Sequence, residues 1–431
     1  MQKTILFLLF FFKANSINIE QFGAVSNSTT YETAIQNGIA FKQTLIAANK
    51  STDDRTVLIE ANKVYTLIPF GLVENLVNVE ILLEGELSAW NGDILKWPQD
   101  QYGHSISLIL LRNTQRLVIK GNGLINGNGN AWWLHVILTG KDNRPNLVDI
   151  SVSKNTQISG IRLINSPQYH LFLMDQLDLN VENISIHIDI RGNNSFIDKI
   201  PLFPLNTDGI DISGRNIYMR NLSILNFDDA VAVKALNAFE SNFTNCTENV
   251  LVEDSFIKYG VGMSVGSVTP NLYVNCIRNV TFRNIKFEKP LKAIYIKANP
   301  GDNGYGLIRN ITYENIEINN AIWWPIFVGP QQQKQPHMSG KSCPFLFPID
   351  GSKCNANPRV TISDITFKNI NINSALLSPG IFICNSTNPC INFVFDNINV
   401  YNRSIIPFEK GFFCENVKAY VTRSNVNPNC N

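Results

Sequence analysis

Short segments in which Ile, Val or Phe alternate with polar residues recur from Asn180 onward. A period of two predicts a β-strand with one buried face. Each segment carries an Asn or Asp, as in NITYENIEI and DITFKNINI, and these residue types favour tight corners. The segments begin at Asn180, Ile217, Cys276, Leu307, Thr361 and Phe393.

This recurrence predicts an all-β solenoid of stacked parallel strands, a parallel β-helix. The starts lie roughly 20 to 60 residues apart, which suits one or two coils of about twenty residues plus loops. A single coil cannot bury its inner face, so stacking must complete the core. An antiparallel sandwich or a propeller is the alternative, but hairpin dipeptides are scarce, since Asn126-Gly127 and Asn128-Gly129 share one glycine-rich corner.

A helix over residues 33–49 is expected to cap the open N-terminal end of the solenoid, because exposed sheet edges invite aggregation. A length of 431 residues alone suggests about two or three domains. No linker, charge run or low-complexity segment marks a second domain, however. The repeats therefore predict one domain over residues 17–431.

The first sixteen residues, MQKTILFLLFFFKANS, have the pattern of a signal peptide. Lys3 precedes eight apolar residues, and Ala14-Asn15-Ser16 offers a cleavage site. Eight apolar residues are too few to span a bilayer, and a buried first strand is the alternative reading. We therefore expect residues 1–16 to be removed and the chain to be secreted, to the extracellular space or the cell wall, without a membrane anchor.

The charge and composition of the chain limit the classes of molecule that it is expected to bind. The chain has 36 Lys and Arg against 35 Asp and Glu, so no net field attracts nucleic acid or an anionic membrane. A hydrophobic fraction of 44% with 16% charged residues fits a large buried core.

Eight cysteines, an even number, fit an oxidising compartment. Local bridges Cys384–Cys390 and Cys414–Cys430 are expected, and the absence of C-x-x-C spacing argues against a zinc site. Glycosylation sequons, some of which are Asn-rich turns, also support secretion. Examples are Asn27, Asn183, Asn221, Asn279 and Asn385.

Three aspartates are candidates for chemistry. Asp228 and Asp229 adjoin in ILNFDDAVAVK, and Asp208 in LNTDGIDI precedes them by about one coil. Equivalent positions of neighbouring coils lie about 4.8 Å apart, so the three carboxylates should meet on one surface. Mutual repulsion raises a carboxyl pKa toward that of a proton donor, and paired carboxyls are the apparatus of glycoside hydrolysis. A calcium site or solvated Asn/Asp corners is the alternative.

Four motifs then occur in order: NTDG (206–209), Asp228-Asp229, GVGMSVGS (260–267) and Tyr295-Ile296-Lys297. They resemble the NTD, DD, GHG and RIK motifs of polygalacturonases, glycoside hydrolase family 28. GNGLINGNGNAWW and the INSP near Ile164 are also similar to segments of this family. The likeness extends from about Ile17 to the C-terminus.

This resemblance implies a right-handed, pectin-lyase-like parallel β-helix that hydrolyses α-linked galacturonan-type chains with inversion, needing no organic cofactor or metal. By the same resemblance, Asp228 donates the proton to the leaving oxygen, while Asp208 and Asp229 activate water. Lys297 binds a substrate carboxylate, and Trp324 loosely matches an aromatic platform for a sugar ring. We expect a polysaccharide as the partner and a monomeric chain.

The stereochemical expectation rests on the resemblance. Carboxyls about 5 Å apart retain configuration, whereas a separation of about 6.5–9.5 Å leaves room for water and inverts. Stacking by one coil favours the shorter distance, and splayed side chains could open it.

Two positions depart from the family pattern. Val261 stands where the family has histidine, and Tyr295 where it has arginine. A valine cannot share a proton, and losing a bidentate carboxylate binder weakens the case for galacturonate, although Tyr295 could contact a neutral sugar. Among the five histidines, His170 is the best substitute in the substrate site, but an ordinary core or surface histidine is the favoured reading.

Two rival functions stay open. A non-catalytic glycan-binding or wall-associated protein would explain Val261 and Tyr295, whereas the intact aspartates argue against it. A pectin or pectate lyase on the same solenoid would need a basic residue near the scissile unit, often with calcium.

Overall fold

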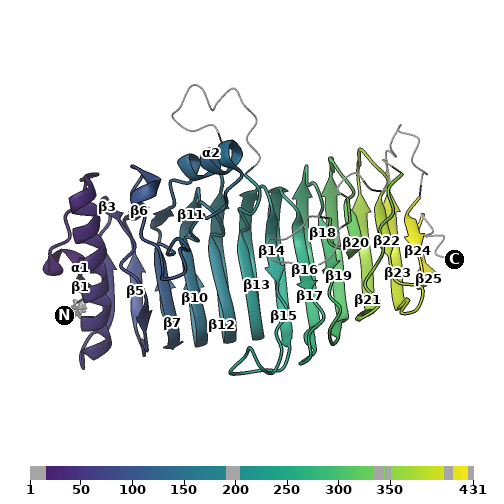
Figure 1. Cartoon of the computed structure of the whole chain (residues 1–431), viewed down its shortest axis with the longest axis horizontal. Coiled ribbons are helices and arrows are strands. Elements are labelled where there is room, and N and C mark those ends of the chain that lie inside the picture. The colour runs from purple at the N-terminus through teal and green to yellow at the C-terminus, as the bar shows by residue number, and fades with distance from the viewer. Residues whose placement is uncertain are drawn as a thin grey trace, which may run out of the picture.

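A computed structural model describes residues 16–190, 204–332, 343–344, 347, 351–401 and 411–425. These residues form an elongated stack of coils, with the N-terminal and C-terminal coils at opposite ends of the long axis (Figure 1). The predicted signal peptide, apart from Ser16, lies outside the described residues.

The first eleven strands build the N-terminal coils. They are β1 (Ile17–Asn18), β2 (Thr56–Ile59), β3 (Val64–Leu67), β4 (Val73–Glu74), β5 (Glu80–Leu83), β6 (Glu86–Ala89), β7 (Ile109–Gln115), β8 (Val118–Lys120), β9 (Leu124–Asn126), β10 (Val148–Ser159) and β11 (Arg162–Ile164).

Two alternating series follow. The long strands are β12 (Leu171–His187), β13 (Ile210–Asn226), β15 (Thr247–Tyr259), β17 (Asn275–Glu288), β19 (Gly306–Asn319), β21 (Val360–Ile372), β23 (Cys390–Val400) and β25 (Val417–Thr422). The short strands are β14 (Asp229–Val233), β16 (Gly262–Val268), β18 (Ile294–Ala298), β20 (Ile326–Pro330), β22 (Gly380–Ile383) and β24 (Phe413–Glu415).

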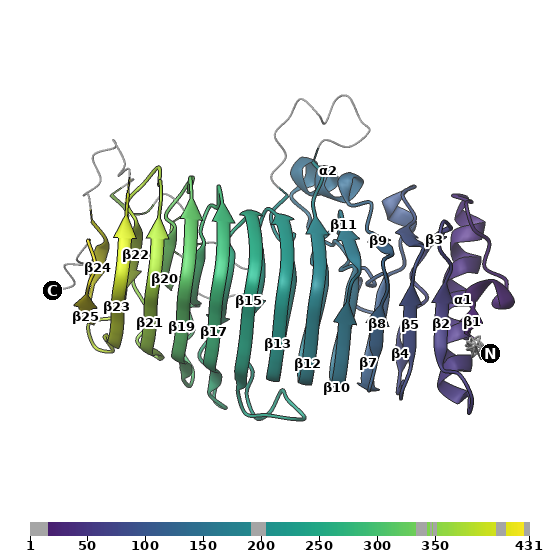
Figure 2. The ribbon, with the colours of Figure 1, turned by 180° about the vertical axis from the view of Figure 1, so that it is seen from behind.

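Each short strand pairs with the next short strand, and each long strand with the next long strand. Pairings between named strands are parallel throughout the described residues, from β1–β2 to β23–β25. Figure 2 shows the long strands side by side with a common direction. The predicted parallel β-helix is confirmed, and the antiparallel alternative is excluded, because each coil hydrogen-bonds to the equivalent segment of the next.

Asparagine ladders explain the recurring Asn at the corners. Asn284, Asn315, Asn369 and Asn397 all adopt a left-handed backbone, with φ between 54° and 60°. Their amides bond from coil to coil: Asn315 Nδ2 donates to Asn284 Oδ1 at 3.0 Å, and Asn369 Nδ2 donates to Asn315 Oδ1 at 2.9 Å. Asparagine tolerates this backbone region and supplies both a donor and an acceptor.

Some sequons belong to equivalent ladders. Asn221 Nδ2 donates to Asn183 Oδ1 at 2.6 Å, and Asn310 Nδ2 donates to Asn279 Oδ1 at 2.8 Å. These three sequon residues, Asn183, Asn221 and Asn279, therefore form structural turns, as the sequence allowed for some of them.

A long helix covers the N-terminal end. α1 (Tyr31–Lys50) begins at Thr30, whose side chain accepts a hydrogen bond from Thr33 N. It buries Phe41 and Leu45 against the first coils. The predicted capping helix is confirmed, and it begins two residues earlier than expected.

A second helix, α2 (Asn130–Thr139), lies at the upper edge of the coils near β11 and β12 (Figure 1). The sequence predicted a glycine-rich corner over residues 126–129 and no helix after it. The helix escaped prediction because its ten residues are apolar on nearly every side, so they show no hydrophobic stripe. It buries Trp132 and Trp133.

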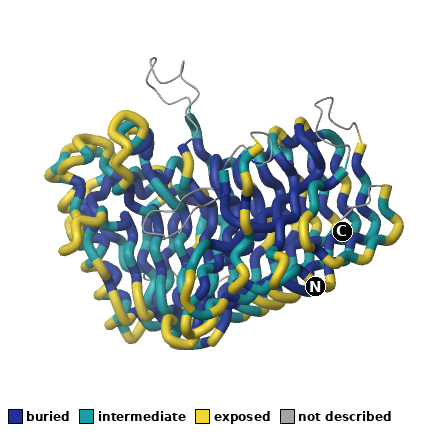
Figure 3. The backbone as a smooth tube through the Cα atoms, turned by 45° about the vertical axis from the view of Figure 1, so that its right-hand side comes forward, coloured by how far each residue is buried: buried dark blue, intermediate teal, exposed yellow. Residues whose placement is uncertain are grey.

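The core fills the inside of the coils along the whole length (Figure 3). A column of aromatic rings runs through its C-terminal part, where Tyr313 stacks on Phe282 at 4.8 Å and Phe395 stacks on Phe367 at 5.1 Å between ring centroids. This column matches the strand spacing, so each coil contributes one ring.

Disulfides Cys246–Cys276, Cys343–Cys354 and Cys384–Cys390 link neighbouring segments. The predicted Cys384–Cys390 bridge is confirmed. The Cys414–Cys430 bridge stays a prediction, because Cys430 lies outside the described residues.

Helices long and apolar enough to cross a bilayer are absent from the part of the chain that the structure describes.

Candidate active site

The register of the short strands brings the three aspartates together. Ile210 at the start of β13 pairs with Val231 of β14, so Asp208 lies opposite Asp229 two residues earlier. Gly209 N donates to Asp229 O at 2.9 Å, which holds the two segments in this register. A side chain at Gly209 would collide with Ala230 O, 2.4 Å from an added Cβ. Glycine therefore permits the close approach of the two coils.

One oxygen from each of Asp208, Asp228 and Asp229 lies within 4.8 Å of the others. All three border a cavity of about 300 Å³. Its walls are formed by Tyr169, Asn206, Asp208, Asp228, Asp229, Lys234, Val261, Ser267, Lys292, Tyr295, Lys297, Asn299, Gln331 and Gln332. The predicted meeting of three acids at one surface is thus present, although each acid is less than 9% exposed.

The Asp228 carboxyl group accepts hydrogen bonds from two backbone amides. Asn206 N donates to its Oδ2 at 2.8 Å, and Asp229 N donates to its Oδ1 at 2.9 Å. Burial and then repulsion from Asp229 nevertheless raise the pKa of Asp228 above its ordinary value. Both effects favour the protonated form of this carboxyl over the ionised form.

Asp229 has both oxygens engaged. Lys297 Nζ lies 2.6 Å from its Oδ2, and the Ser264 hydroxyl donates to its Oδ1. Lys297 comes from β18 and Ser264 from β16, so neighbouring coils supply both partners. Asp229 is therefore fixed in position by a cation and a hydroxyl donor from two different coils.

Asp208 is surrounded differently. Burial first, and then the charge of Asp211 and the other aspartates, raises the pKa of Asp208 well above its ordinary value. Lys234 opposes this shift: its Nζ lies 3.9 Å from Asp208 Oδ2 and 3.0 Å from Asp211 Oδ2. Burial lowers the pKa of Lys234, but Asp211 and Asp208 raise it by more, so the ammonium stays charged.

The same trio could in principle hold a cation. Within the described ranges, Asp208, Asp228 and Asp229 are the one group of three acidic, histidine or cysteine residues close enough to do so. Lys297 and Lys234 already provide positive charge beside two of them. The residues present therefore suit a lysine-balanced acid cluster more than a divalent ion.

Two lysines lie close to the ring of Tyr295. Lys292 Nζ lies 4.7 Å and Lys297 Nζ 4.8 Å from the ring centroid, within the range of cation–π attraction. Tyr295 Oη accepts a hydrogen bond from Gln332 N at 2.9 Å. Tyr295 lines the cavity, as the motif suggested, but its ring and hydroxyl are engaged with protein groups.

Lys292 is a cavity residue that the sequence motifs did not indicate. It is 4% exposed and lines the cavity. Burial and then the charge of Lys297 lower the pKa of Lys292 to about 7. The one signal in the sequence was a lysine at the border of an apolar run, KAIYIKA, which is normally a solvated strand end.

His170 does not reach the cavity. It is fully buried; its Nδ1 lies 3.0 Å from Asp208 O, and Ser166 N donates to its Nε2 at 3.3 Å. Burial lowers the pKa of His170 to about 4. The assignment to the substrate site is therefore corrected: His170 is the ordinary core histidine that the sequence favoured, and it contacts the backbone of Asp208.

Trp324 also needs correction. It is 1% exposed and packs in a side cluster with Val261, Tyr295 and Phe327. A ring that is buried to this extent cannot serve as an open platform for a sugar.

Val261 lines the cavity and donates its N–H to Asp228 O at 2.8 Å, so it contributes backbone and apolar surface where a histidine was expected from the motif.

Known proteins resemble this chain over most of its length. The model of the glycosyl hydrolases family 28 matches residues 52–426. The chain belongs to glycosyl hydrolase family 28. This family 28 chain is 24% identical over 410 residues to a probable polygalacturonase of Arabidopsis thaliana, covering 93% of this chain and 77% of that protein. It is 27% identical over 379 residues to a probable exopolygalacturonase of Neosartorya fischeri, covering 83% and 80%.

Solved structures of family 28 members share the fold. An endo-xylogalacturonan hydrolase from Aspergillus tubingensis superposes with a TM-score of 0.61 at 20% identity, covering 92% of this chain and 95% of the other. A family 28 exopolygalacturonase of Yersinia enterocolitica gives a TM-score of 0.66 at 13% identity, covering 96% and 76%. The predicted family and its β-helical architecture are confirmed.

Proposed function

We propose that this chain is a secreted hydrolase that cleaves glycosidic bonds of a pectic, galacturonan-type polysaccharide. The observation that carries the proposal is the cavity in which Asp228, with a raised pKa, faces Asp208 and the lysine-paired Asp229. Two carboxyl groups in different environments are what glycoside hydrolysis requires. The resemblance of the leader to a signal peptide supports secretion.

Asp228 is the proposed general acid. The family motif gives Asp228 this role, burial raises its pKa, and two backbone amides fix its orientation. Transfer of this proton to the glycosidic oxygen makes the sugar a better leaving group.

Asp208 and Asp229 are the proposed water-activating pair. Both oxygens of Asp229 form hydrogen bonds, one with Lys297 and one with Ser264. This carboxylate is therefore poorly suited to act as a nucleophile that bonds to the sugar. Asp208 Oδ1 is buried at the cavity and has no hydrogen-bond partner among the described residues, and the proposal requires that the attacking water reach it. These contacts favour inversion. The oxygens converge within 4.8 Å, which by the separation rule alone would favour retention. The anomeric configuration of the first product, followed by NMR, decides between them.

The lysines support an acidic sugar as the substrate. Lys234, Lys292 and Lys297 all line the cavity beside the three aspartates. Charge-assisted bonds from lysine to a uronate carboxylate are strong in such a buried setting. The names of the relatives, polygalacturonase and endo-xylogalacturonan hydrolase, point to the same class.

The decisive experiment compares the natural chain with Asp228→Asn on polygalacturonan, rhamnogalacturonan and related galactosyl polymers. Release of reducing ends by the natural chain is expected, with a loss of at least about a hundredfold in the variant. Asp254→Asn is a matched control, since Asp254 accepts from Asn284 in an exposed ladder where asparagine is the usual residue. Equal loss in both variants, or no reducing ends from any polymer, contradicts the proposal.

A lyase is the second candidate, and one observation favours it. Lys292, with a pKa lowered to about 7, could accept a proton from a uronate ring. Ultraviolet absorbance of unsaturated products, measured in the same incubations, separates this reaction from hydrolysis. Binding of polymer without either product would leave a non-catalytic glycan-binding protein.

A further inference from the structure

Three consecutive turns beside the cavity carry exposed apolar side chains. We call this group the aromatic shelf: Phe239, Leu272, Tyr273 and Tyr305, which are 76%, 78%, 54% and 63% exposed. Single exposed apolar residues are common, but a contiguous group on neighbouring turns usually marks an interaction site.

Each of these turns leaves directly from the wall of the cavity. The cavity residues and the shelf residues that follow them after five or six positions are Lys234 and Phe239, Ser267 and Leu272–Tyr273, and Asn299 and Tyr305. The turns follow β14, β16 and β18, which are adjacent in the sheet. A chain held in the cavity and longer than the cavity can therefore continue onto the shelf.

The turns are joined to one another. Phe239 stacks on Tyr273 with ring centroids 5.1 Å apart and an interplanar angle of 13°. Asn271 and Tyr305 exchange backbone hydrogen bonds of 3.0 and 3.1 Å. Three turns tied in this way present one surface.

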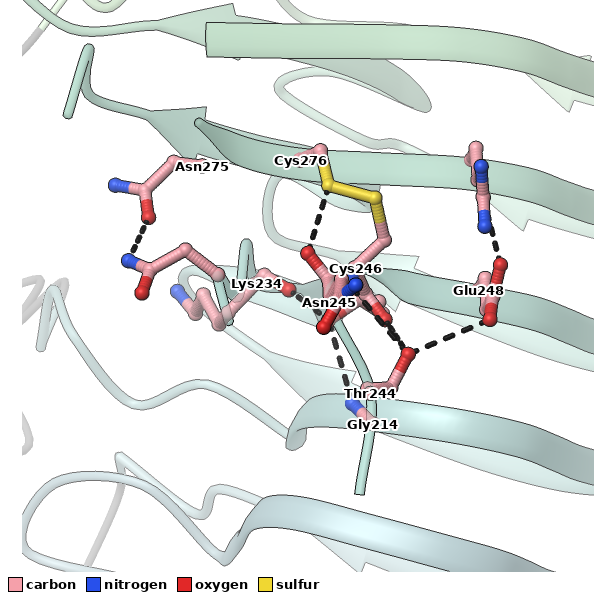
Figure 4. Close-up of a disulfide and its surroundings, with 11 residues drawn as sticks. Gly214, Lys234, Thr244, Asn245, Cys246, Glu248, Asn275 and Cys276 are labelled. Carbon is pink, nitrogen blue, oxygen red and sulfur yellow. Dashed lines mark hydrogen bonds and ion pairs between the residues drawn. A yellow bond between two sulfur atoms is a disulfide. The ribbon is translucent and has the colours of Figure 1, made fainter. Parts of the chain in front are cut away.

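A disulfide joins the first two turns. Cys246 ends the first turn and Cys276 directly follows the second, and Lys234 and Asn275 lie next to the bridge (Figure 4). Asn237 Nδ2 also donates to Asn275 Oδ1 at 2.6 Å. The shelf is thus held in place before any ligand arrives, which reduces the entropy lost on binding.

Charge distinguishes the shelf from the cavity. The turns over residues 235–246, 269–275 and 299–305 contain Glu240 and Asp302, both exposed, and no Lys, Arg or His. The cavity, by contrast, holds three lysines beside its three aspartates. An anionic sugar can pair with lysine in the cavity but meets only acidic charge at the shelf, whereas an uncharged sugar can lay its apolar face on the aromatic rings.

We propose that the aromatic shelf binds uncharged sugar residues, methyl-esterified or neutral, of the same polysaccharide whose acidic residue occupies the cavity. The inference rests on the proposed function for the identity of the polymer. It adds a second binding surface and a substrate preference, namely a pectic chain in which charged and uncharged residues both occur.

Affinity electrophoresis in gels that contain polymer tests this without turnover. The Asp228→Asn protein serves as the background, and Phe239→Ser with Tyr273→Ser removes the stacked rings. On highly methyl-esterified polygalacturonan the double change should weaken retention at least about fivefold. On de-esterified polygalacturonan retention should change less than about twofold. Tyr420→Ser on β25, another exposed tyrosine (67%), is the matched control.

Equal retention of the shelf variant and its background on the esterified polymer overturns the proposal. So does a dimer in sedimentation that the same substitutions dissociate, because the shelf would then be an interface between copies of the chain. Failure of the proposed hydrolysis is seen separately, as absence of reducing ends, and leaves shelf-dependent retention intact.

Discussion

Lys297 Nζ lies 2.6 Å from Asp229 Oδ2, and both side chains are almost inaccessible to solvent. Two residues that lie 68 positions apart in the chain thus form a buried ion pair at the cavity. Removing one partner of such a pair leaves an uncompensated charge in a medium of low polarity.

Lys297→Met is therefore expected to lower the free energy of unfolding by about 3–5 kcal/mol and to abolish hydrolysis. Urea denaturation measures the first effect and reducing-end release the second. The double variant Lys297→Met with Asp229→Asn should regain much of the lost stability, because no lone charge remains. Additive losses in the two single variants would show that the pair does not act as a unit.

Lys292 predicts a pH limit on binding. With its pKa lowered to about 7 by burial and Lys297, its ammonium loses the proton as pH rises through about 7. Affinity for an acidic oligosaccharide should fall over that range. Lys292→Arg should move the fall to higher pH, since arginine stays charged, and Lys292→Met should bind weakly at all pH values. Calorimetric titration from pH 5 to 9 measures all three.

The lowered pKa of Lys292 also affects the free energy of unfolding. This free energy should rise with pH over the range in which the affinity falls. A lowered lysine pKa means that the folded chain binds fewer protons than the unfolded chain between about pH 7 and 10. The unfavourable contribution of Lys292 is therefore full below pH 7 and is relieved as pH rises across that window. Lys292→Met should raise the free energy of unfolding most at pH 6, and an unchanged value there would contradict the buried ammonium.

The Cys246–Cys276 disulfide closes a loop with a sequence separation of 30. Replacing both cysteines by serine should lower the free energy of unfolding by about 3–4 kcal/mol through the added freedom of the unfolded chain. Thermal unfolding with and without reductant measures this. Retention on esterified polymer should also weaken, because the disulfide braces two turns of the aromatic shelf.

Asn315 tests the ladder. It has φ of 56°, donates to Asn284 and accepts from Asn369. Asn315→Ala should cost about 2–3 kcal/mol, since alanine loses two hydrogen bonds and is strained in this backbone region. Asn315→Gly loses the same bonds without the strain, so it should cost about 1 kcal/mol less. Equal losses would assign the whole effect to the hydrogen bonds.

Much of the fold was predictable because its signals are local. Alternation along segments such as 307–318 marks strands, and the recurring asparagines mark corners whose left-handed backbone few residues tolerate. The meeting of Asp208 with Asp229 was also predictable, since a solenoid converts a separation of one coil into a single strand spacing. The short helix α2 was not, because its apolar residues lack a stripe.

The class of fold, the family and the group of acids could all be predicted from repeat spacing and residue type. Which side chains face the cavity could not. His170 and Trp324 point inward, and Lys292 reaches the cavity wall. Orientation and burial depend on packing between coils that are distant along the chain, and a residue carries no local sign of what its neighbouring coil will place against it.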